Sequence, residues 1–205
     1  VNVDGYMVVA TSAGTVEVLN SNGDLVGSCN VGSIVNSTVA ASGSSLYLVS
    51  RDGKLHVLEL EKNGAWGAVS GIKETKTVDL GLTGSACVPT LQDSKLFIGG
   101  EVKGGSALAI VDIASLKTQL ITTADGSALP AGGIKGAPLV SQQASGTYAY
   151  FTVNYGGTTD YVNYTSGGGA YCYKLGDAEA SAIYTAAGHN NFCDSPIASD
   201  ANGNL

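Results

Sequence analysis

A glycine-rich insertion from Asn154 to Gly169 carries the residues best suited to bind a ligand. A tyrosine offers a flat apolar face and a hydroxyl, while aspartate and asparagine side chains can read hydroxyl groups by hydrogen bonding. Such residues on a loop suit the recognition of a sugar or of a partner protein. The alternative is a decorated hairpin whose tyrosines only cover its own glycines. The candidate ligand-binding residues are Tyr155, Asp160, Tyr161, Asn163 and Tyr164.

Two segments have the alternating Asp and Asn residues that open a calcium-binding loop, namely Asp200 to Asn204 and, less closely, Asn20 to Asp24. No glutamate follows to complete the ligand set, so we interpret both as hairpin turns. His189 and Cys193 are four residues apart beside Asp194, but only two or three ligands are visible there. A surface histidine and a structural cysteine are the simpler interpretation. The sequence therefore predicts no metal site.

The four cysteines, Cys29, Cys87, Cys172 and Cys193, allow three pairings, and none of their spacings is typical of a zinc site. Cys172 and Cys193 are close enough in sequence to form a disulfide. Two free, buried thiols explain them equally well. The cysteines alone do not fix the compartment of the protein.

The composition favours one globular β-rich unit and excludes some partners. The chain has 205 residues, of which 44% are hydrophobic and 13% charged, and its 29 glycines suit short strands and tight turns. Its net charge of -7 would repel phosphate backbones and anionic membrane surfaces. No apolar run approaches the roughly 18 residues of a membrane-spanning helix. We therefore expect no nucleic-acid binding and no membrane insertion.

The elements that must position these residues are best defined in the stretch from Ser44 to Trp66. Residues 46–49 are apolar and β-prone, the turn Arg51-Asp52-Gly53-Lys54 follows, and residues 55–60 alternate in polarity. Asp-Gly between two such runs is a strong signal for a β-hairpin. The same outline returns elsewhere in the chain, which makes the hairpin a repeated unit.

The repeat has the period of a β-propeller blade. Tyr6, Tyr47, Phe97 and Tyr150 align as equivalent buried residues of each second strand, at separations of 41, 50 and 53 residues. A four-stranded blade takes about 40 to 50 residues. The third strands align at Val18, Val57, Ile110 and Cys172, which predicts a core position for Cys172.

We therefore expect an all-β fold, a β-propeller with about four blades of four antiparallel strands, in which residues 1–205 form a single propeller segment. The predicted units are residues 1–33, 34–83, 84–133, 134–188 and a partial unit at 189–205. The register places the next second-strand aromatic at about position 206. We thus expect part of a larger propeller, in contact with its remainder or with a second copy. Strand exchange between residues 194–199 and the first unit, which would close a four-bladed ring, is the alternative.

One unit resembles a known family. The residues LYLVSRDGKLHVLEL, from Leu46 to Leu60, followed by Asn63-Gly64-Ala65-Trp66, resemble the repeat of quinoprotein-like propellers of the pyrroloquinoline-quinone type. In that family a strand, an Asp-Gly turn, a second strand and a Gly before Trp recur in each blade. For its dehydrogenases the resemblance implies a quinone held near a calcium ion and a vicinal cysteine pair. This sequence has one tryptophan and no adjacent cysteines, so no cofactor is predicted.

Three functional hypotheses follow from the sequence. The first is a non-catalytic propeller module that acts as a scaffold or recognition surface for protein or carbohydrate ligands. We expect it in an exported or cell-surface bacterial protein, extracellular or periplasmic. The second is a fragment of a quinone-dependent alcohol or sugar dehydrogenase. The third, a sugar-active propeller enzyme, requires paired carboxylates at a central pocket, and only Asp93 and Asp194 lie near strand starts.

Overall fold

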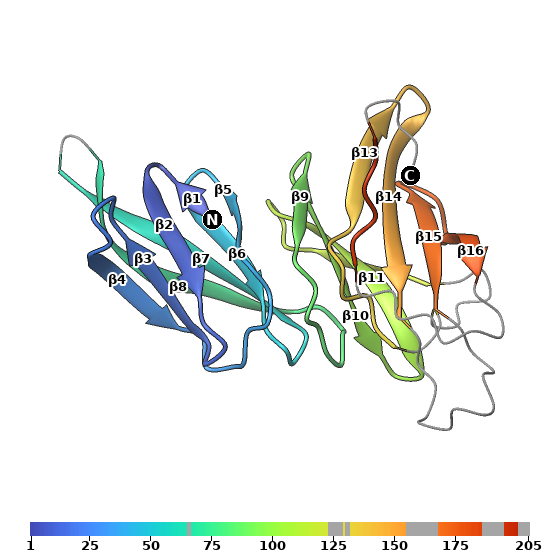
Figure 1. The fold of residues 1–205 in the computed structure, drawn as a ribbon, viewed down its shortest axis with the longest axis horizontal. Coiled ribbons are helices and arrows are strands. Elements are labelled where there is room, and N and C mark those ends of the chain that lie inside the picture. Colours follow the sequence, from blue (N-terminus) through green and yellow to red (C-terminus); the bar gives the residue numbers. More distant parts are fainter. Residues whose placement is uncertain (65–66, 123–128, 130–131, 155–167, 186–194, 201–205) are drawn as a thin grey trace.

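The computed structural model describes residues 1–64, 67–122, 129, 132–154, 168–185 and 195–200 (Figure 1). These residues form sixteen β-strands and no helix, in four separate four-stranded sheets. Within each sheet, strands adjacent in sequence pair antiparallel. The prediction of an all-β chain with four antiparallel units is confirmed.

The strands have the following bounds. The first sheet comprises β1 (Asn2–Val3), β2 (Tyr6–Ala10), β3 (Thr15–Leu19) and β4 (Leu25–Asn30). The second comprises β5 (Ala40–Ser42), β6 (Ser45–Val49), β7 (Lys54–Asn63) and β8 (Ala68–Asp79). The third comprises β9 (Thr90–Gln92), β10 (Lys95–Val102), β11 (Gly105–Asp112) and β12 (Thr118–Ile121). The fourth comprises β13 (Leu139–Gln143), β14 (Gly146–Val153), β15 (Gly169–Lys174) and β16 (Ser181–Thr185).

The four sheets follow one another along an open arc. The first sheet, drawn in blue, and the fourth, drawn in orange, lie at opposite ends of the molecule (Figure 1). Residues 195–200 contain no strand and lie against the fourth sheet, where the Thr152 hydroxyl donates to the Ser195 carbonyl oxygen at 2.9 Å. The strand exchange that would close a four-bladed ring is therefore not formed by the described residues.

Strand pairing defines which residues are equivalent in the four sheets. Tyr47 pairs with Val57, Phe97 with Ile110 and Tyr150 with Cys172, as the sequence predicted. These pairs lie at the same point of the second and third strands. The repeat therefore holds at single-residue precision in the second, third and fourth sheets.

The alignment of Tyr6 was wrong. In the first sheet Val18 pairs with Val8, so Val8 is the residue equivalent to Tyr47. Tyr6 lies two positions earlier, and its hydroxyl oxygen accepts a hydrogen bond from the Val69 amide at 3.2 Å. Its ring packs against the apolar core between the first two sheets. Aligning by aromatic type therefore selected a tyrosine at a different position of the strand.

Three apolar cores lie between successive sheets, because the side chains of each central strand alternate between its two neighbours. Val8 and Leu46 belong to the core between the first and second sheets. Tyr47 and Leu96 belong to the next core, and Phe97 and Phe151 to the third. Burial of these apolar side chains is the main term that holds the sheets together.

Burial at the equivalent positions depends on the following sheet. Tyr47 is 5% exposed and Phe97 is 1% exposed, because each faces the next sheet. Tyr150 and Cys172 are only half-buried, so the prediction that all four aligned positions are core positions was wrong for the fourth sheet. Their side of the sheet turns away from the third sheet, and no further sheet of the described residues packs there.

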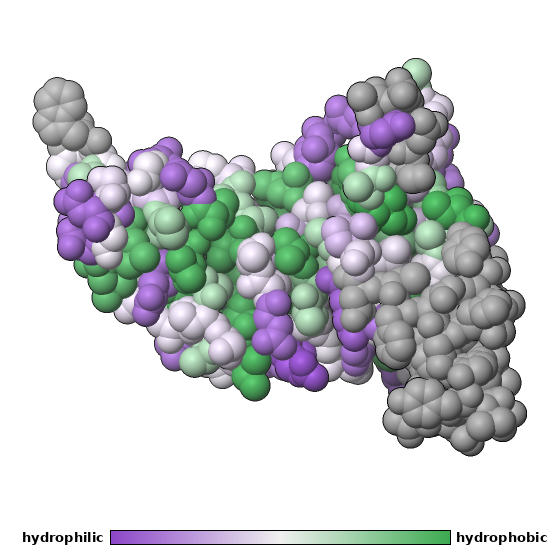
Figure 2. Space-filling view, in the orientation of Figure 1, coloured by the Kyte–Doolittle hydropathy of each residue, from purple (hydrophilic) through white to green (hydrophobic). Residues whose placement is uncertain are grey.

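The outward side of the first sheet is apolar and exposed. Met7 is 55% exposed and Val9 is 37% exposed, whereas Val8 between them is 1% exposed. Figure 2 shows apolar side chains at the surface over this sheet. The equivalent residues of the second sheet, Leu46 and Leu48, are fully buried against the first. Only the first sheet therefore leaves this row of apolar residues uncovered.

The glycine of the second-to-third-strand turn is required by geometry. Gly14 and Gly53 occupy equivalent turns with φ of 84° and 79°. A Cβ at Gly14 would lie 2.2 Å from the Ser33 carbonyl oxygen, and one at Gly53 would lie 2.3 Å from that of Leu82. Both the left-handed backbone and the contact with the following connection therefore exclude a side chain.

The described cysteines are free thiols, and one of the two candidate calcium loops is a hydrogen-bonded turn. Cys29, Cys87 and Cys172 are unpaired, while Cys193 lies outside the described residues. Asn20 Oδ1 accepts hydrogen bonds from the amides of Asn22 and Asp24, each at 2.9 Å, which confirms a turn. Of the segment from Asp200 to Asn204, only Asp200 is described.

We predict that Tyr47→Ala lowers the free energy of unfolding by about 3 to 5 kcal/mol, because it removes a large buried side chain. Tyr150→Ala is the matched control at an equivalent but half-buried position, with an expected cost of about 1 kcal/mol. Chemical denaturation followed by circular dichroism measures both values. Equal costs for the two variants would contradict the assignment of Tyr47 to a core between two sheets and of Tyr150 to an uncovered side of its sheet.

Candidate functional site

One hydrogen bond recurs at the same end of three sheets. The amides of Arg51, Glu101 and Asn154 donate to carbonyl oxygens of the connection that enters each sheet. The acceptors are Ile34 at 2.7 Å, Gly84 at 2.8 Å and Gly133 at 2.9 Å. Each donor lies four residues after the equivalent positions Tyr47, Phe97 and Tyr150. The three residues are therefore structurally equivalent.

The connection between the second and third sheets also donates to the carbonyl oxygens of two of these residues, and only for Arg51 is it a second connection besides the one that accepts its amide. The Ser85 amide donates to the Arg51 carbonyl oxygen at 3.1 Å, and the Thr83 amide donates to that of Glu101 at 2.8 Å. Only main-chain atoms of Arg51 and Glu101 take part in these bonds. The main chain at both positions is thus fixed, while the type of side chain is left open. Such positions suit a role in specificity.

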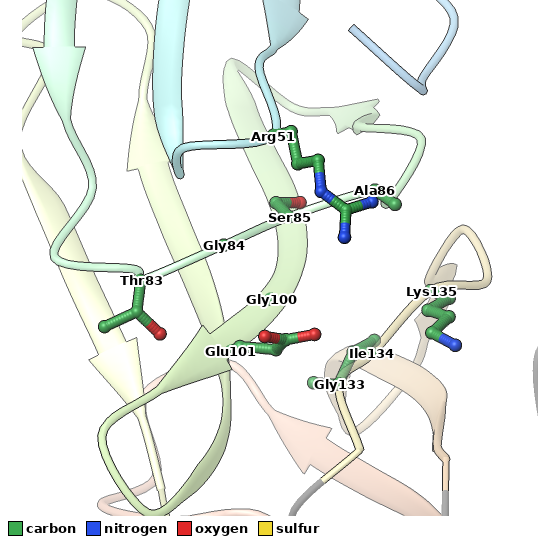
Figure 3. Close-up of a pocket in the computed structure, with 10 residues that line it drawn as sticks. All are labelled: Arg51, Thr83, Gly84, Ser85, Ala86, Gly100, Glu101, Gly133, Ile134 and Lys135. Carbon is green, nitrogen blue, oxygen red and sulfur yellow. The ribbon is translucent and has the colours of Figure 1, made fainter. Parts of the chain in front are cut away.

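A cavity of about 320 Å³ lies at this end, between the second sheet, the third sheet and the connection that enters the fourth. Figure 3 shows the Arg51 and Glu101 side chains pointing into it from two different sheets, with Lys135 on a third wall. A Cβ at Gly100 would lie 2.6 Å from Leu82 Cδ1, so glycine there allows the close approach of a wall. The lining residues are Arg51, Thr83, Gly84, Ser85, Ala86, Gly100, Glu101, Gly133, Ile134 and Lys135.

The cavity concentrates charge. Two of the ten lysine and arginine residues of an acidic chain line it, opposite one glutamate. Within the described part of the chain, neither Arg51 nor Glu101 forms a side-chain ion pair. Both side chains are exposed. Their donors and acceptors are therefore available to a ligand.

A buried polar network holds the turn that carries Arg51. The Ser50 hydroxyl donates to Asp52 Oδ1 at 2.5 Å and lies 2.8 Å from His56 Nε2. Nδ1 of the same ring lies 2.7 Å from Glu74 Oε1. This is the order of a hydrolytic Ser-His-acid triad, but Ser50 is 0% exposed and its proton is directed at Asp52. We interpret the network as a clamp on the turn.

The same contacts stabilise the ionised form of Asp52. The hydrogen bond from Ser50 is the largest cause that lowers the pKa of Asp52 well below its ordinary value, and Lys54 and Ser33 lower it further. Partial burial acts in the opposite direction. Lys54 Nζ lies 3.0 Å from Asp52 Oδ2, and the Ser33 hydroxyl donates to Oδ1 at 3.0 Å. Charge-assisted hydrogen bonds of this kind favour the carboxylate.

The candidate residues chosen from the sequence, Tyr155, Asp160, Tyr161, Asn163 and Tyr164, lie outside the described residues. The strands that flank their insertion are described. β14 ends at Val153 and pairs with β15 from Gly169, which puts both ends of the insertion at the same end of the sheets as Arg51 and Glu101.

Sequence reasoning missed the cavity residues, although a signal for them was present. Arg51 was assigned only to a turn, and Glu101 and Lys135 were given no role. The register that aligned Tyr47 with Phe97, extended by four residues, marks Arg51 and Glu101 as equivalent positions. Lys135 has no such signal, because its place depends on the path of a connection.

The described residues do not fit the quinone and calcium that the family resemblance implies. They contain no group of three or more His, Cys, Asp or Glu side chains arranged to hold a metal ion. Cys87 is fully buried, and burial raises the pKa of its thiol to about 12. His189, Cys193 and Asp194 lie outside the described residues, and Asp93 lies in the turn between β9 and β10.

Comparison with known proteins finds similar folds but no similar sequence family. No protein-family model and no curated protein match the sequence. Among solved structures, the chain resembles quinohemoprotein alcohol dehydrogenase from Comamonas testosteroni with a TM-score of 0.65 and 15% identity, over 96% of this chain and 36% of that one. It resembles BamB from Moraxella catarrhalis with a TM-score of 0.57 and 15% identity, over 86% and 48%.

The Dos1 propeller is a third similar structure, with a TM-score of 0.58 and 15% identity, over 88% of this chain and 44% of that one. The fold is that of a β-propeller. Its four sheets are blades, and the resemblance to quinoprotein-type propellers is confirmed at the level of the fold. The chain spans less than half the length of each of these three structures. None of the described residues forms a helix able to cross a bilayer.

We predict that Ser50→Ala raises the pKa of Asp52 toward its ordinary value of about 4. Because the folded pKa is lowered, the stabilising contribution of Asp52 is fully present above that value and is lost as the pH falls toward the folded pKa. Ser33→Ala is the matched control, since Ser33 contributes less to the shift. Carboxyl-carbon NMR titration measures both variants. An equal or smaller rise for Ser50→Ala would contradict the clamp.

Proposed function

We propose that this propeller segment is a recognition module, and that it binds a protein or glycan ligand at the blade end that carries Arg51, Glu101 and Lys135. The observation that carries the proposal is the charged cavity, where Arg51 and Glu101 are held by their main chain but form no ion pair among the described residues. A concave site with a few convergent polar groups is the usual form of a ligand site.

The position of the insertion from Asn154 to Gly169 supports a ligand site at the same end of the blades. Its flanking strands bring residues 154 and 168 to this end, where loops of successive blades meet. In the proposed module the tyrosines of the insertion, Tyr155, Tyr161 and Tyr164, with Asp160 and Asn163, contribute to the same binding surface. A rigid scaffold that presents variable loops at one end is a common arrangement for recognition.

The proposed module also makes contacts through the outward faces of its first and fourth blades. The exposed Met7 and Val9 on the first blade, and the half-buried Tyr150 on the fourth, suit contact with the rest of a larger propeller or with a second copy. We take residues 1–205 as a single propeller segment of an exported or cell-surface protein, a placement that rests on the family resemblance alone.

We predict that the chain binds selected ligands on combined glycan and protein arrays, and that variants at the proposed end lose this binding. Arg51→Gln and the double variant Tyr161→Ala, Tyr164→Ala each remove groups from that end. Lys117→Ala is the control, because Lys117 follows β11 and lies at the opposite end of its blade. Binding that survives both variants but fails in Lys117→Ala would place recognition elsewhere. Melting temperatures near that of the unmodified chain show that the variants are folded.

A further inference from the structure

We propose that the cavity between Arg51 and Glu101 binds the carboxylate of an acidic sugar of the uronate type. Arg51 holds the carboxylate, and Glu101 accepts hydrogen bonds from neighbouring hydroxyls. The inference rests on the proposed recognition function and names the ligand class of its site.

Arg51 is arranged to receive a carboxylate. Its amide is bonded to Ile34 and its carbonyl to Ser85, so the stem of the side chain starts from a point fixed by two connections. The adjacent Ser50 and Asp52 are fixed by the buried network with His56. A guanidinium presents its donors in a planar fork that matches the two oxygens of a carboxylate. No acidic side chain of the described residues occupies that fork.

Glu101 decides which carboxylates fit. Its own carboxylate lies in the same cavity, where it repels a simple anion but accepts hydrogen bonds from any donor that the ligand brings. A uronate carries its carboxylate on C5, with one hydroxyl on the adjacent C4 and further hydroxyls on C3 and C2, and so supplies both an acceptor for Arg51 and donors for Glu101. The side chain of an acidic peptide places its carboxylate on an apolar stem, and the nearest donors are main-chain amides in place of hydroxyls. The paired charges therefore favour the acidic sugar.

The size and lining of the cavity agree with one sugar residue. A volume of about 320 Å³ is at the lower end of the range for small-molecule sites. Gly84, Gly100 and Gly133 contribute main chain and no side chain to the walls. Polar main-chain groups therefore form part of the cavity wall, which suits a hydroxylated ligand better than an apolar one.

The test is isothermal titration of the 205-residue chain with sodium glucuronate, glucose and sodium propionate. We expect glucuronate to bind at least ten times more tightly than either comparison compound, because each of those carries only half of the required groups. Arg51→Gln should weaken glucuronate binding at least tenfold. Lys103→Ala removes a positive charge from the same blade end without touching the cavity and should change the affinity less than twofold. Glu101→Gln should lower the ratio of the affinity for glucuronate to the affinity for propionate.

Several outcomes would overturn the inference. Propionate binding as tightly as glucuronate would replace the acidic sugar by a simple carboxylate, the acidic side chain of a peptide included. Glucuronate binding that is unchanged in Arg51→Gln would move the site elsewhere. If glucuronate does not bind while the arrays still show binding that depends on Arg51, the ligand class is wrong and the recognition function stands. If the arrays also show no binding that depends on Arg51, both the ligand class and the proposed recognition function are wrong.

Discussion

A hydrogen bond from the end of the second strand to the preceding connection, present in the second, third and fourth blades, fixes the relation between neighbouring blades. It is made by the amides of Arg51, Glu101 and Asn154, and each bond is 2.9 Å or shorter. Apolar burial between blades supplies most of the stabilising free energy, but it is not directional. These bonds add direction, because each ties one blade to the chain segment that enters from the blade before it. The cavity is lined by Arg51 and Glu101, the tied residues of two neighbouring blades.

This arrangement separates the structural role of a position from its chemical role. The tie uses only main-chain atoms, so its geometry does not depend on whether the residue is arginine, glutamate or asparagine. The side chain can then vary from blade to blade without loss of the fold. The apolar rows behave in the opposite way, since Leu46 and Leu48 are fully buried and their side chains are the contact. The proposed ligand site therefore uses side chains at the tied positions, where they are not needed for packing.

The sequence predicted the architecture well, because the Asp-Gly turn and the alternation around Tyr47 are local signals with a local cause. It failed at Tyr6, where an aromatic side chain entered the neighbouring core from a different strand position. It also overestimated burial at Tyr150 and Cys172, since burial there depends on a following blade and not on residue type. The register marks Arg51 and Glu101 as equivalent positions, but the complete cavity could not be predicted, because Lys135 joins its lining only through the path of a connection.

The most direct test of this account is amide hydrogen exchange, resolved by NMR, at the three tied positions. Arg51, Glu101 and Asn154 lie at strand ends or in turns, where amides commonly exchange within seconds to minutes unless they are bonded. The account predicts that all three exchange as slowly as the central amides of β6 and β10. Exchange as fast as that of Lys103, in the neighbouring turn, would show that the blades are not tied at this end and that the cavity has no fixed walls.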